Sequence, residues 1–305
     1  MKLRVGTRGS KLSVTQTAAF LKELQFHERD YELVIVKTEG DIRQEEKFTD
    51  MGVKGIFTKE LDDALLEGRV DFAVHSLKDV PSKLHENIHL VAATSCLDPR
   101  DAFLSNQFDS LEKLPAGSIV GTSSVRRKAQ ILAMKKNLIV HELRGNVETR
   151  IQKMKFGSYD AIILAASGVK RMGMESEIRE FLDPIKFVPC ICQGIVGVTA
   201  LKTNDKIEKI LKKKQNPEAM MHALILREFM MKAEGGCSIP LGAHLVMEND
   251  IITMWGYLSD PEGEQIIQEK VSLPMEEKYQ LVHQLLEKME RKGFRELIER
   301  LHHGQ

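Results

Sequence analysis

Short apolar runs alternate with helical patterns through most of the first 200 residues of the chain. The runs are rich in β-branched and aromatic residues and are bounded by breakers, which predicts strands at residues 3–5, 31–36, 70–74, 88–93, 118–121, 138–143 and 160–165. Between them, apolar side chains recur at helical spacing, in the groups Val14/Ala18/Leu21, Leu61/Leu65/Leu66, Val125/Ala129/Leu132 and Val147/Ile151/Met154. This alternation predicts parallel sheets covered by helices on both faces, in two α/β domains that face each other and are split near residues 94–99.

The last third of the chain has a different pattern. A lysine run at residues 212–214 and Pro217 precede a long helical pattern at residues 220–232. Two strand-like segments follow at residues 251–258 and 265–271, separated by a turn rich in breakers. Apolar residues at helical spacing then close the chain, at Leu281, Leu285, Met289, Phe294, Leu297 and Leu301. This order predicts a small α+β domain at the C-terminus.

Composition narrows the class of protein. The chain has 305 residues, 42% of them hydrophobic, with 44 Lys and Arg balanced by 44 Asp and Glu. That length predicts more than one domain, and that apolar content excludes wholesale disorder. Four cysteines are too few for a disulfide scaffold, and neither a signal peptide nor a membrane-length apolar run is visible. We therefore expect a soluble, cytoplasmic, multidomain protein.

The zero net charge conceals a basic segment. Residues 118–171 hold five Arg and six Lys against Glu142, Glu148 and Asp160, which is 11 − 3 = +8. The remaining residues must therefore carry a charge of −8. The neutral total excludes a uniformly basic protein but not a local site for a polyanion.

Three predicted strands end in tight turns that carry cationic or hydroxyl side chains. Arg8 and Ser10 follow the first strand, the run TSSVRR at residues 122–127 follows another, and the run RGNVETR at residues 144–150 follows a third. In α/β folds, ligands bind beyond the carboxyl ends of strands, and helix N-termini favour anions. Arginines in the first turn of a helix oppose its dipole, so these turns indicate a bound polyanion rather than scattered surface charge.

Two further segments could carry chemistry. Asp79 lies beside Lys78 and just before Val80 and Pro81, so its backbone is held rigidly, although a structural turn would look the same. Cys237 follows two glycines, and small neighbours would let it carry an attached group; a buried thiol is the plainer alternative. No metal site is expected, because Cys190 and Cys192 have no second pair of ligands at metal spacing.

Taken together, these segments resemble the porphobilinogen deaminase (hydroxymethylbilane synthase) family. The resemblance spans nearly the whole chain, and its segments come in the family's order. It rests on RVGTR at residues 4–8, KGIFTKEL at 54–61, AVHSLKDVP at 73–81, and the stretches at 121–127, 144–150 and 234–242.

The resemblance implies a three-domain α/β fold. Two domains are expected to be similar to periplasmic binding proteins, with the chain crossing between them twice, and a small α+β domain should present the cofactor cysteine to the cleft. The implied boundaries are residues 1–94 with 195–213 for domain 1, 95–194 for domain 2 and 214–305 for domain 3. Family precedent also implies a monomer.

The resemblance also implies an activity, a cofactor and site residues. Family members deaminate porphobilinogen and join four units head-to-tail on a dipyrromethane cofactor, which a thioether links to the cysteine that matches Cys237 here. Asp79 matches the catalytic aspartate, and Phe57 belongs to a segment similar to the lid. The residues that match binders of the acetate and propionate groups are Arg8, Lys78, Arg126, Arg127, Arg150 and Arg171, with hydroxyls from Ser10, Ser76, Thr122, Ser123 and Ser124.

The chain departs from the family pattern near the expected second crossing. Cys192 replaces a small residue, and Thr199 and Leu201 stand where many members have Glu and Arg; in the lid, residues 51–53 lack a common Gly-Gly pair. One alternative is therefore a non-catalytic or impaired paralogue that binds anionic small molecules. An RNA-binding protein is disfavoured, because the arginine-bearing turns contain no stacking aromatic residue.

Overall fold

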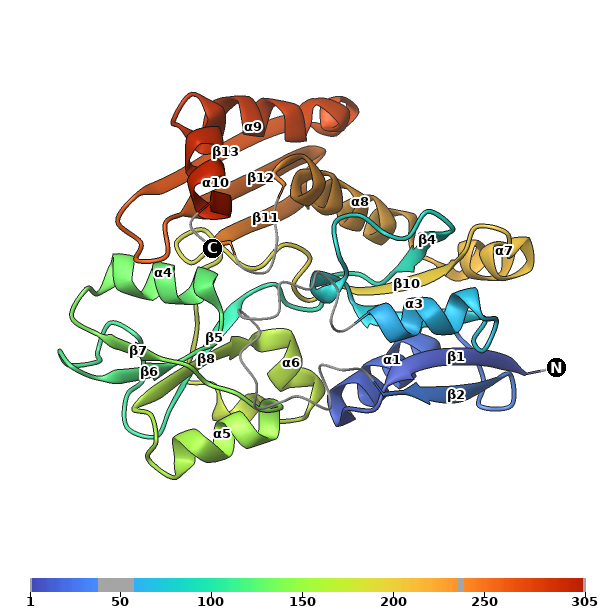
Figure 1. The fold of residues 1–305 in the computed structure, drawn as a ribbon, viewed down its shortest axis with the longest axis horizontal. Coiled ribbons are helices and arrows are strands. Elements are labelled where there is room, and N and C mark those ends of the chain that lie inside the picture. Colours follow the sequence, from blue (N-terminus) through green and yellow to red (C-terminus); the bar gives the residue numbers. More distant parts are fainter. Residues whose placement is uncertain (1, 38–57, 235–238, 304–305) are drawn as a thin grey trace. The chain divides into compact units, whose positions relative to one another are not determined.

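Three β-sheets with packed helices make up the computed structural model, which describes residues 2–37, 58–234 and 239–303 (Figure 1). Contacts divide the chain into two compact units, residues 1–98 with 193–224 and residues 99–192 with 225–305. The first unit holds one α/β sheet, and the second holds another α/β sheet together with the C-terminal sheet. The predicted class is confirmed: two α/β domains and a small α+β domain. The three predicted domain boundaries stay a prediction.

The sheet of the first unit has the strand order β2-β1-β3-β10-β4. Its strands are β1 (Leu3–Arg8), β2 (Tyr31–Val36), β3 (Phe72–Ser76), β4 (Ile88–Ala93) and β10 (Val196–Leu201). Strand β1 runs parallel to β2 and β3, whereas β10 runs antiparallel to β3 and β4. The helices of this unit are α1 (Lys11–Glu23), α3 (Lys59–Leu66), the 3-10 turn η2 (Leu77–Asp79) and α7 (Asp205–Lys214).

Helix α1 forms where the sequence predicts a helix, and its buried face includes only part of the predicted stripe. Ala18 of the predicted stripe is exposed, while Gln16, Thr17, Phe20 and Leu21 are buried. The buried Thr17 donates its hydroxyl to Thr7 Oγ1 of β1 at 2.8 Å, so a polar contact lies where the pattern predicts an apolar one. Of the predicted stripe, Leu21 is buried and Val14 is half-buried, so only Ala18 was assigned to the wrong face.

The α/β sheet of the second unit has the order β7-β6-β8-β5-β9. Its strands are β5 (Asp101–Ser105), β6 (Ile119–Gly121), β7 (Ile139–His141), β8 (Ala161–Ala165) and β9 (Glu180–Phe181), and its helices are α4 (Val125–Met134), α5 (Val147–Lys155), α6 (Ala166–Arg171) and the 3-10 turn η3 (Glu175–Glu177). Strand β6 is parallel to β7 and β8, whereas β5 is antiparallel to β8 and β9. Both α/β sheets are therefore mixed, which corrects the prediction of parallel sheets.

The C-terminal sheet is an antiparallel meander of three strands in the order β11-β12-β13. The strands are β11 (Leu241–Glu248), β12 (Ile251–Ser259) and β13 (Ile266–Pro274). Helix α9 (Leu281–Glu290) packs on β12 and β13 and contacts α10 (Phe294–His303), as Figure 1 shows in orange and red. The 3-10 turn η4 (Met275–Gln280) leads into α9, and α8 (Pro217–Lys232) precedes the domain, with Pro217 at its first position, where a missing N–H costs nothing.

Several elements escaped the sequence prediction. Strands β5, β10 and β11 were not predicted, nor was α7, whose last turn contains the lysine run. Lysines there interact favourably with the negative end of the helix dipole, and Lys214 donates to the carbonyl of Leu24 at 2.8 Å. The lysine run therefore completes a helix of the first unit and is not a linker.

The segments that connect the two α/β sheets are hydrogen-bonded to each other. The Thr94 N–H donates to the Val196 carbonyl at 2.9 Å, and the Leu97 N–H donates to the Gly194 carbonyl at 3.3 Å. Between these pairs, the Cys96 thiol donates to the Gln193 carbonyl at 3.3 Å. The chain thus leaves and re-enters the first unit side by side.

None of the helices in the described ranges is both long and apolar enough to cross a membrane.

A buried histidine makes the stability of the C-terminal domain depend on pH. His244 of β11 is 8% exposed and stacks on Trp255 of β12, with 5.5 Å between ring centroids. Burial lowers the pKa of His244 to about 4, and the nearby Asp183 only partly opposes this. The imidazole is therefore neutral in the folded domain, while in the unfolded chain it takes up a proton below about pH 6.5. This contribution to stability is complete above pH 6.5 and declines as the pH falls from 6.5 toward 4.

We expect His244→Phe to flatten the pH dependence of unfolding. Each pH unit of differential protonation is worth about 1.4 kcal/mol, so the wild type should lose about 2 kcal/mol more than the variant between pH 7 and pH 5. Trp255 is the single tryptophan of the chain, so its fluorescence in a urea titration reports this domain. The exposed His302→Gln serves as the control. Equal pH dependence of His244→Phe and wild type would contradict the prediction.

Candidate active site

The first unit gathers five of the predicted site residues at one edge of its sheet. Strands β1 and β3 are parallel, so Arg8 and Ser76, their last residues, both lie at the carboxyl end. Ser10 caps α1: its Oγ accepts from the Ser13 N–H at 3.2 Å. The Ser76 hydroxyl donates to Gln16 Oε1 of α1 at 2.9 Å. The remaining two, Lys78 and Asp79, follow in η2, directly after β3.

The η2 turn fixes Lys78 and Asp79 by burying the residues on either side of them. Leu77 and Val80 lie in the core, and the Leu77 N–H donates to the Ile195 carbonyl at 3.0 Å. Lys78 and Asp79 are left half-buried at the sheet edge. The Lys78 ammonium lies 3.4 Å from Oε1 of the buried Gln193, whereas no side chain of the described residues hydrogen-bonds with the Asp79 carboxylate. The carboxylate is therefore available to a bound cationic group.

The second unit gathers hydroxyls at the carboxyl end of β6. Ser124 caps α4, accepting from the Arg127 N–H at 3.4 Å, and Thr122 Oγ1 accepts from the Ser124 N–H at 3.2 Å. The Ser123 hydroxyl donates to the Leu143 carbonyl, which comes just after β7, at 2.5 Å. These contacts fix the turn between β6 and α4, so the N-terminus of α4 stays at this edge.

Arg126 and Arg127 are buried and share one internal carboxylate. Asp101, the first residue of β5, is fully buried and accepts from Arg126 Nη2 at 2.8 Å and from Arg127 Nε and Nη2 at 2.9 and 2.7 Å. Arg126 also donates to the Val188 carbonyl at 2.6 Å and Arg127 to the Ile163 carbonyl at 3.1 Å. Asp101 thus provides the anion for two arginines in the first turn of α4. Their contact with a ligand stays a prediction.

Other cations lie at the same edge of this sheet. Arg150 of α5 is half-buried and donates from Nε to the Gly145 carbonyl at 2.7 Å, and Arg171 is the half-buried last residue of α6. Arg100, which the sequence analysis missed, lies 4.1 Å from the ring centroid of Phe181, and Lys170 Nζ lies 4.7 Å from it. Because β5 is antiparallel to β8, its start lies at the end of β8, and the Ala166 N–H donates to the Arg100 carbonyl at 3.0 Å. Recognising β5 would have placed Arg100 among the candidates.

Two predicted residues lie outside the described residues, namely Cys237 and Phe57. The cysteine loop lies between the end of α8 and the start of β11. Both residues stay predictions.

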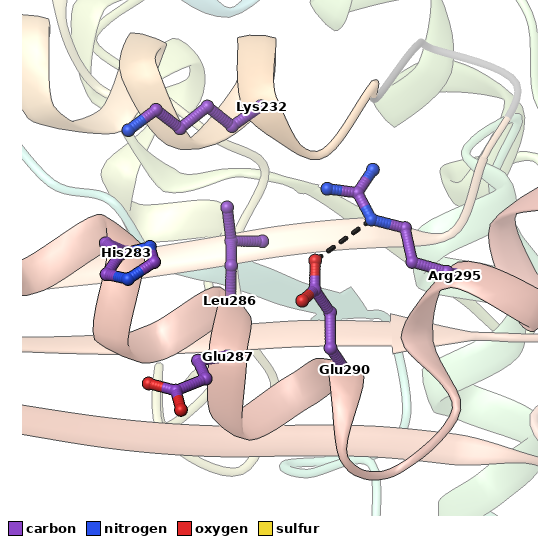
Figure 2. Close-up of a pocket in the computed structure, with 6 residues that line it drawn as sticks. All are labelled: Lys232, His283, Leu286, Glu287, Glu290 and Arg295. Carbon is purple, nitrogen blue, oxygen red and sulfur yellow. Dashed lines mark hydrogen bonds and ion pairs between the residues drawn. The ribbon is translucent and has the colours of Figure 1, made fainter.

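The C-terminal domain carries a hollow of about 280 Å³ that contains none of the predicted site residues. Figure 2 shows its lining, which comes from the end of α8, from α9 and from α10: Lys232, His283, Leu286, Glu287, Glu290 and Arg295. Its charges pair with one another or with close neighbours: Arg295 Nε contacts Glu290 at 3.0 Å, and Lys232 contacts Glu228 at 2.7 Å. We assign it no role in binding, because paired, solvent-exposed charges need no ligand.

Comparison with known families accounts for the two α/β sheets and the C-terminal sheet. Residues 3–209 match the family described as porphobilinogen deaminase, dipyromethane cofactor binding domain, and residues 220–291 match porphobilinogen deaminase, C-terminal domain. The chain belongs to the porphobilinogen deaminase family. This confirms the resemblance seen in the sequence and supports a role in tetrapyrrole synthesis.

Several solved structures of other proteins are distantly similar to this family member. The methionine binding protein MetQ has a TM-score of 0.44 at 14% identity, with 74% of this chain and 95% of that chain covered. Immunogenic lipoprotein A from Vibrio vulnificus has a TM-score of 0.43 at 13% identity, with 73% and 99% covered. A nutrient binding protein from Burkholderia cenocepacia bound to methionine has a TM-score of 0.41 at 14% identity, with 75% and 95% covered.

Proposed function

We propose that this chain is an active hydroxymethylbilane synthase that joins four porphobilinogen molecules into a linear tetrapyrrole. In each cycle the carbon–nitrogen bond to ammonia breaks, a carbon–carbon bond forms to a pyrrole α-carbon, and that carbon loses its proton; water then releases the product. The observation that carries the proposal is the gathering of cations and hydroxyls at one edge of each α/β sheet, in a chain of this family. The proposal includes a cytoplasmic monomer.

The cations suit a substrate that carries two carboxylates per unit. Arginine can bind a carboxylate through two parallel hydrogen bonds and stays charged when partly desolvated. Arg8 and Lys78 provide this charge in the first unit, and Arg150 and Arg171 provide it in the second. The hydroxyls of Ser10, Ser76, Thr122, Ser123 and Ser124 lie at the same two edges and supply hydrogen bonds to the carboxylates or to pyrrole N–H groups.

Asp79 suits the stabilisation of positive charge. Loss of ammonia leaves an electrophile with developing positive charge, and a fixed carboxylate nearby lowers the energy of that state. The η2 turn holds the Asp79 backbone between two buried residues, and its carboxylate is not committed to another side chain of the described residues. The same group can accept the proton that the attacked pyrrole carbon loses.

The described residues fit a bound dipyrromethane by their chemistry. The group carries several carboxylates, and the two sheet edges present Arg and Lys side chains of matching charge; in addition, Nε of the buried Arg126 has no acceptor among the described residues. When bound, dipyrromethane supplies the nucleophilic pyrrole carbon for the first addition. Cys237 is the proposed attachment point through a thioether, with Arg126, Arg127 and Arg150 among the residues that would hold the carboxylates.

Intact-mass measurement of the freshly purified protein tests this proposal. We expect the mass of the chain plus two pyrrole units, and we expect Cys237→Ser to remove the adduct completely. Cys190→Ser is the matched control, because Cys190 is a half-buried thiol that the proposal leaves unmodified. An unmodified wild type that does not consume porphobilinogen would favour the alternative, a non-catalytic paralogue that binds anionic small molecules. An adduct that survives Cys237→Ser would refute the attachment.

A further inference from the structure

We infer that Asp101 is a positioning residue that fixes the arginines of α4 and ties this helix to the strand that follows the cysteine loop. The inference rests on the proposed function. Asp101 was absent from the sequence prediction, because the strand that begins with it, β5, was missed. Its carboxylate is fully buried, and three charge-assisted hydrogen bonds join it to Arg126 and Arg127, which are 3% and 7% exposed.

The cluster has one negative charge for two positive charges. Away from water, two guanidinium groups that share a carboxylate attract it strongly and repel each other. Removing the carboxylate would take from both arginines the counter-ion that they share, which is among the costlier changes possible in a protein interior. Asp101 therefore determines whether both arginines can stay in their present rotamers. Arg126 Nε has no acceptor among the described residues, and the side chains of Asp101, Arg126 and Arg127 together carry a net charge of +1.

Arg126 extends this cluster toward the C-terminal domain. The Val188 carbonyl accepts from Arg126 Nη1 at 2.6 Å and from Gln130 Nε2 at 3.0 Å, and the Val188 N–H donates to Gln130 Oε1 at 2.6 Å. The next carbonyl, that of Pro189, accepts from the Ala243 N–H of β11 at 3.1 Å. A continuous set of hydrogen bonds therefore runs from Asp101 through α4 to β11.

The start of β11 packs tightly against the Pro189 carbonyl and Arg126. A Cβ on Gly242 would lie 2.7 Å from the Pro189 carbonyl oxygen and 3.2 Å from Arg126 Cδ, so the two backbones approach as closely as glycine allows. Cys237 lies four residues before Leu241, the first residue of β11. Because Gly242 packs against Arg126, the position of Arg126 constrains the start of β11, which follows Cys237 in the sequence. Asp101 in turn fixes Arg126.

The variant Asp101→Asn tests the inference, because it keeps the shape of the side chain and removes its charge. We expect the fraction of chains that carry the adduct to fall about tenfold or more by intact mass, and any loaded protein to show a raised KM for porphobilinogen with a smaller change in kcat. The matched control is Asp109→Asn in the same domain, which removes an exposed ion pair with Lys113 and should leave both quantities unchanged.

A second variant separates positioning from folding. Asp101→Asn combined with Arg127→Gln returns the summed charge of the three side chains to +1, so it should unfold at a higher urea concentration than Asp101→Asn alone. Because Arg127 is itself a proposed carboxylate binder, the reference for adduct and KM is Arg127→Gln alone, and a purely structural role for Asp101 would make the double variant equal to it. We expect stability to recover while the adduct fraction stays below, and KM above, the values of Arg127→Gln alone.

Four outcomes would refute either the proposed function or the inference that Asp101 is a positioning residue. A wild type without adduct or turnover would refute the proposed function. A loaded wild type together with an equally loaded Asp101→Asn of normal KM would overturn the inference alone. Recovery of adduct and KM in the double variant to the values of Arg127→Gln alone would overturn it too, and so would a double variant that does not fold, because Asp101 would then support the fold as a whole.

Discussion

Asp79→Asn should fold normally and lose nearly all turnover of porphobilinogen, with kcat reduced by about 1,000-fold. Asparagine has almost the same shape, and no described side chain depends on the carboxylate, so the η2 turn should stay intact. What the substitution removes is a negative charge and a proton acceptor at the edge where β3 ends. The measurement is steady-state release of product, with circular dichroism and the urea midpoint to show that folding is unchanged.

Two further variants make this result specific. Asp79→Glu keeps the charge but moves it outward by about one carbon–carbon bond, so we expect activity between that of Asp79→Asn and wild type. Glu32→Gln removes an exposed carboxylate from β2 of the same sheet and should leave kcat unchanged. If Asp79→Asn retained more than about a tenth of wild-type kcat, Asp79 would lose its proposed role, since a positioned acid–base group contributes at least about 100-fold.

The sequence predicted those elements whose apolar pattern is strong. Strands β2 and β4 have the predicted bounds, and α5 buries Ile151 and Met154 as its pattern indicates. Buried strands flanked by breakers have few alternatives, because their β-branched residues favour extended backbone. Apolar spacing predicted helix α1 itself, but it could not predict that the buried Thr17 would form a hydrogen bond with Thr7 of β1.

The missed strand β5 directly follows a local sequence that is typical of a turn. The β5 sequence, DAFLS, begins with an aspartate directly after Asp98, Pro99 and Arg100, a run that predicts a turn. Only the pairing of β5 with β8 and β9 makes it a strand, and only the neighbouring α4 makes its aspartate an internal counter-ion. Partners distant in sequence leave no local periodicity, so neither the strand nor the charge cluster could be predicted.

The arginine-bearing turns illustrate the same limit for the candidate site. Arginines in the first turn of a helix oppose the helix dipole, and they were therefore interpreted as a sign of a bound polyanion. At α4, the anion that contacts them is Asp101 of the chain itself. The sequence placed cations next to the carboxyl ends of strands but could not distinguish arginines that face a ligand from arginines that hold the site in shape. Arg150 and Arg171, which are half-buried, fit the first description better than the buried pair does.

The second crossing was identified from the sequence as unusual, and its geometry explains why small residues matter there. Cys192 is 1% exposed and has φ of 62°, a conformation that costs a non-glycine residue about 1–2 kcal/mol. Gly194, two residues later, has φ of 90°. A Cβ there would lie 2.8 Å from both the Asp98 carbonyl oxygen and the Cys96 sulfur atom of the first crossing. The two crossings can be hydrogen-bonded side by side only because residue 194 has no side chain.

Gly194→Ala should therefore destabilise the protein by about 3 kcal/mol or more, the sum of the left-handed backbone cost and of a clash with backbone that cannot rotate away. Gly157→Ala is the matched control: its φ is 83°, but a Cβ meets nothing within 4 Å, so the backbone cost alone, about 1 kcal/mol, should remain. Urea midpoints of the two variants against wild type measure the difference.

Because Gly194 adjoins Gln193, whose side chain accepts from Lys78, Gly194→Ala should also raise KM for porphobilinogen, whereas Gly157→Ala should not. Equal destabilisation by the two substitutions would mean that the crossings can separate without cost, and the close approach at Gly194 would then have no role in holding them together.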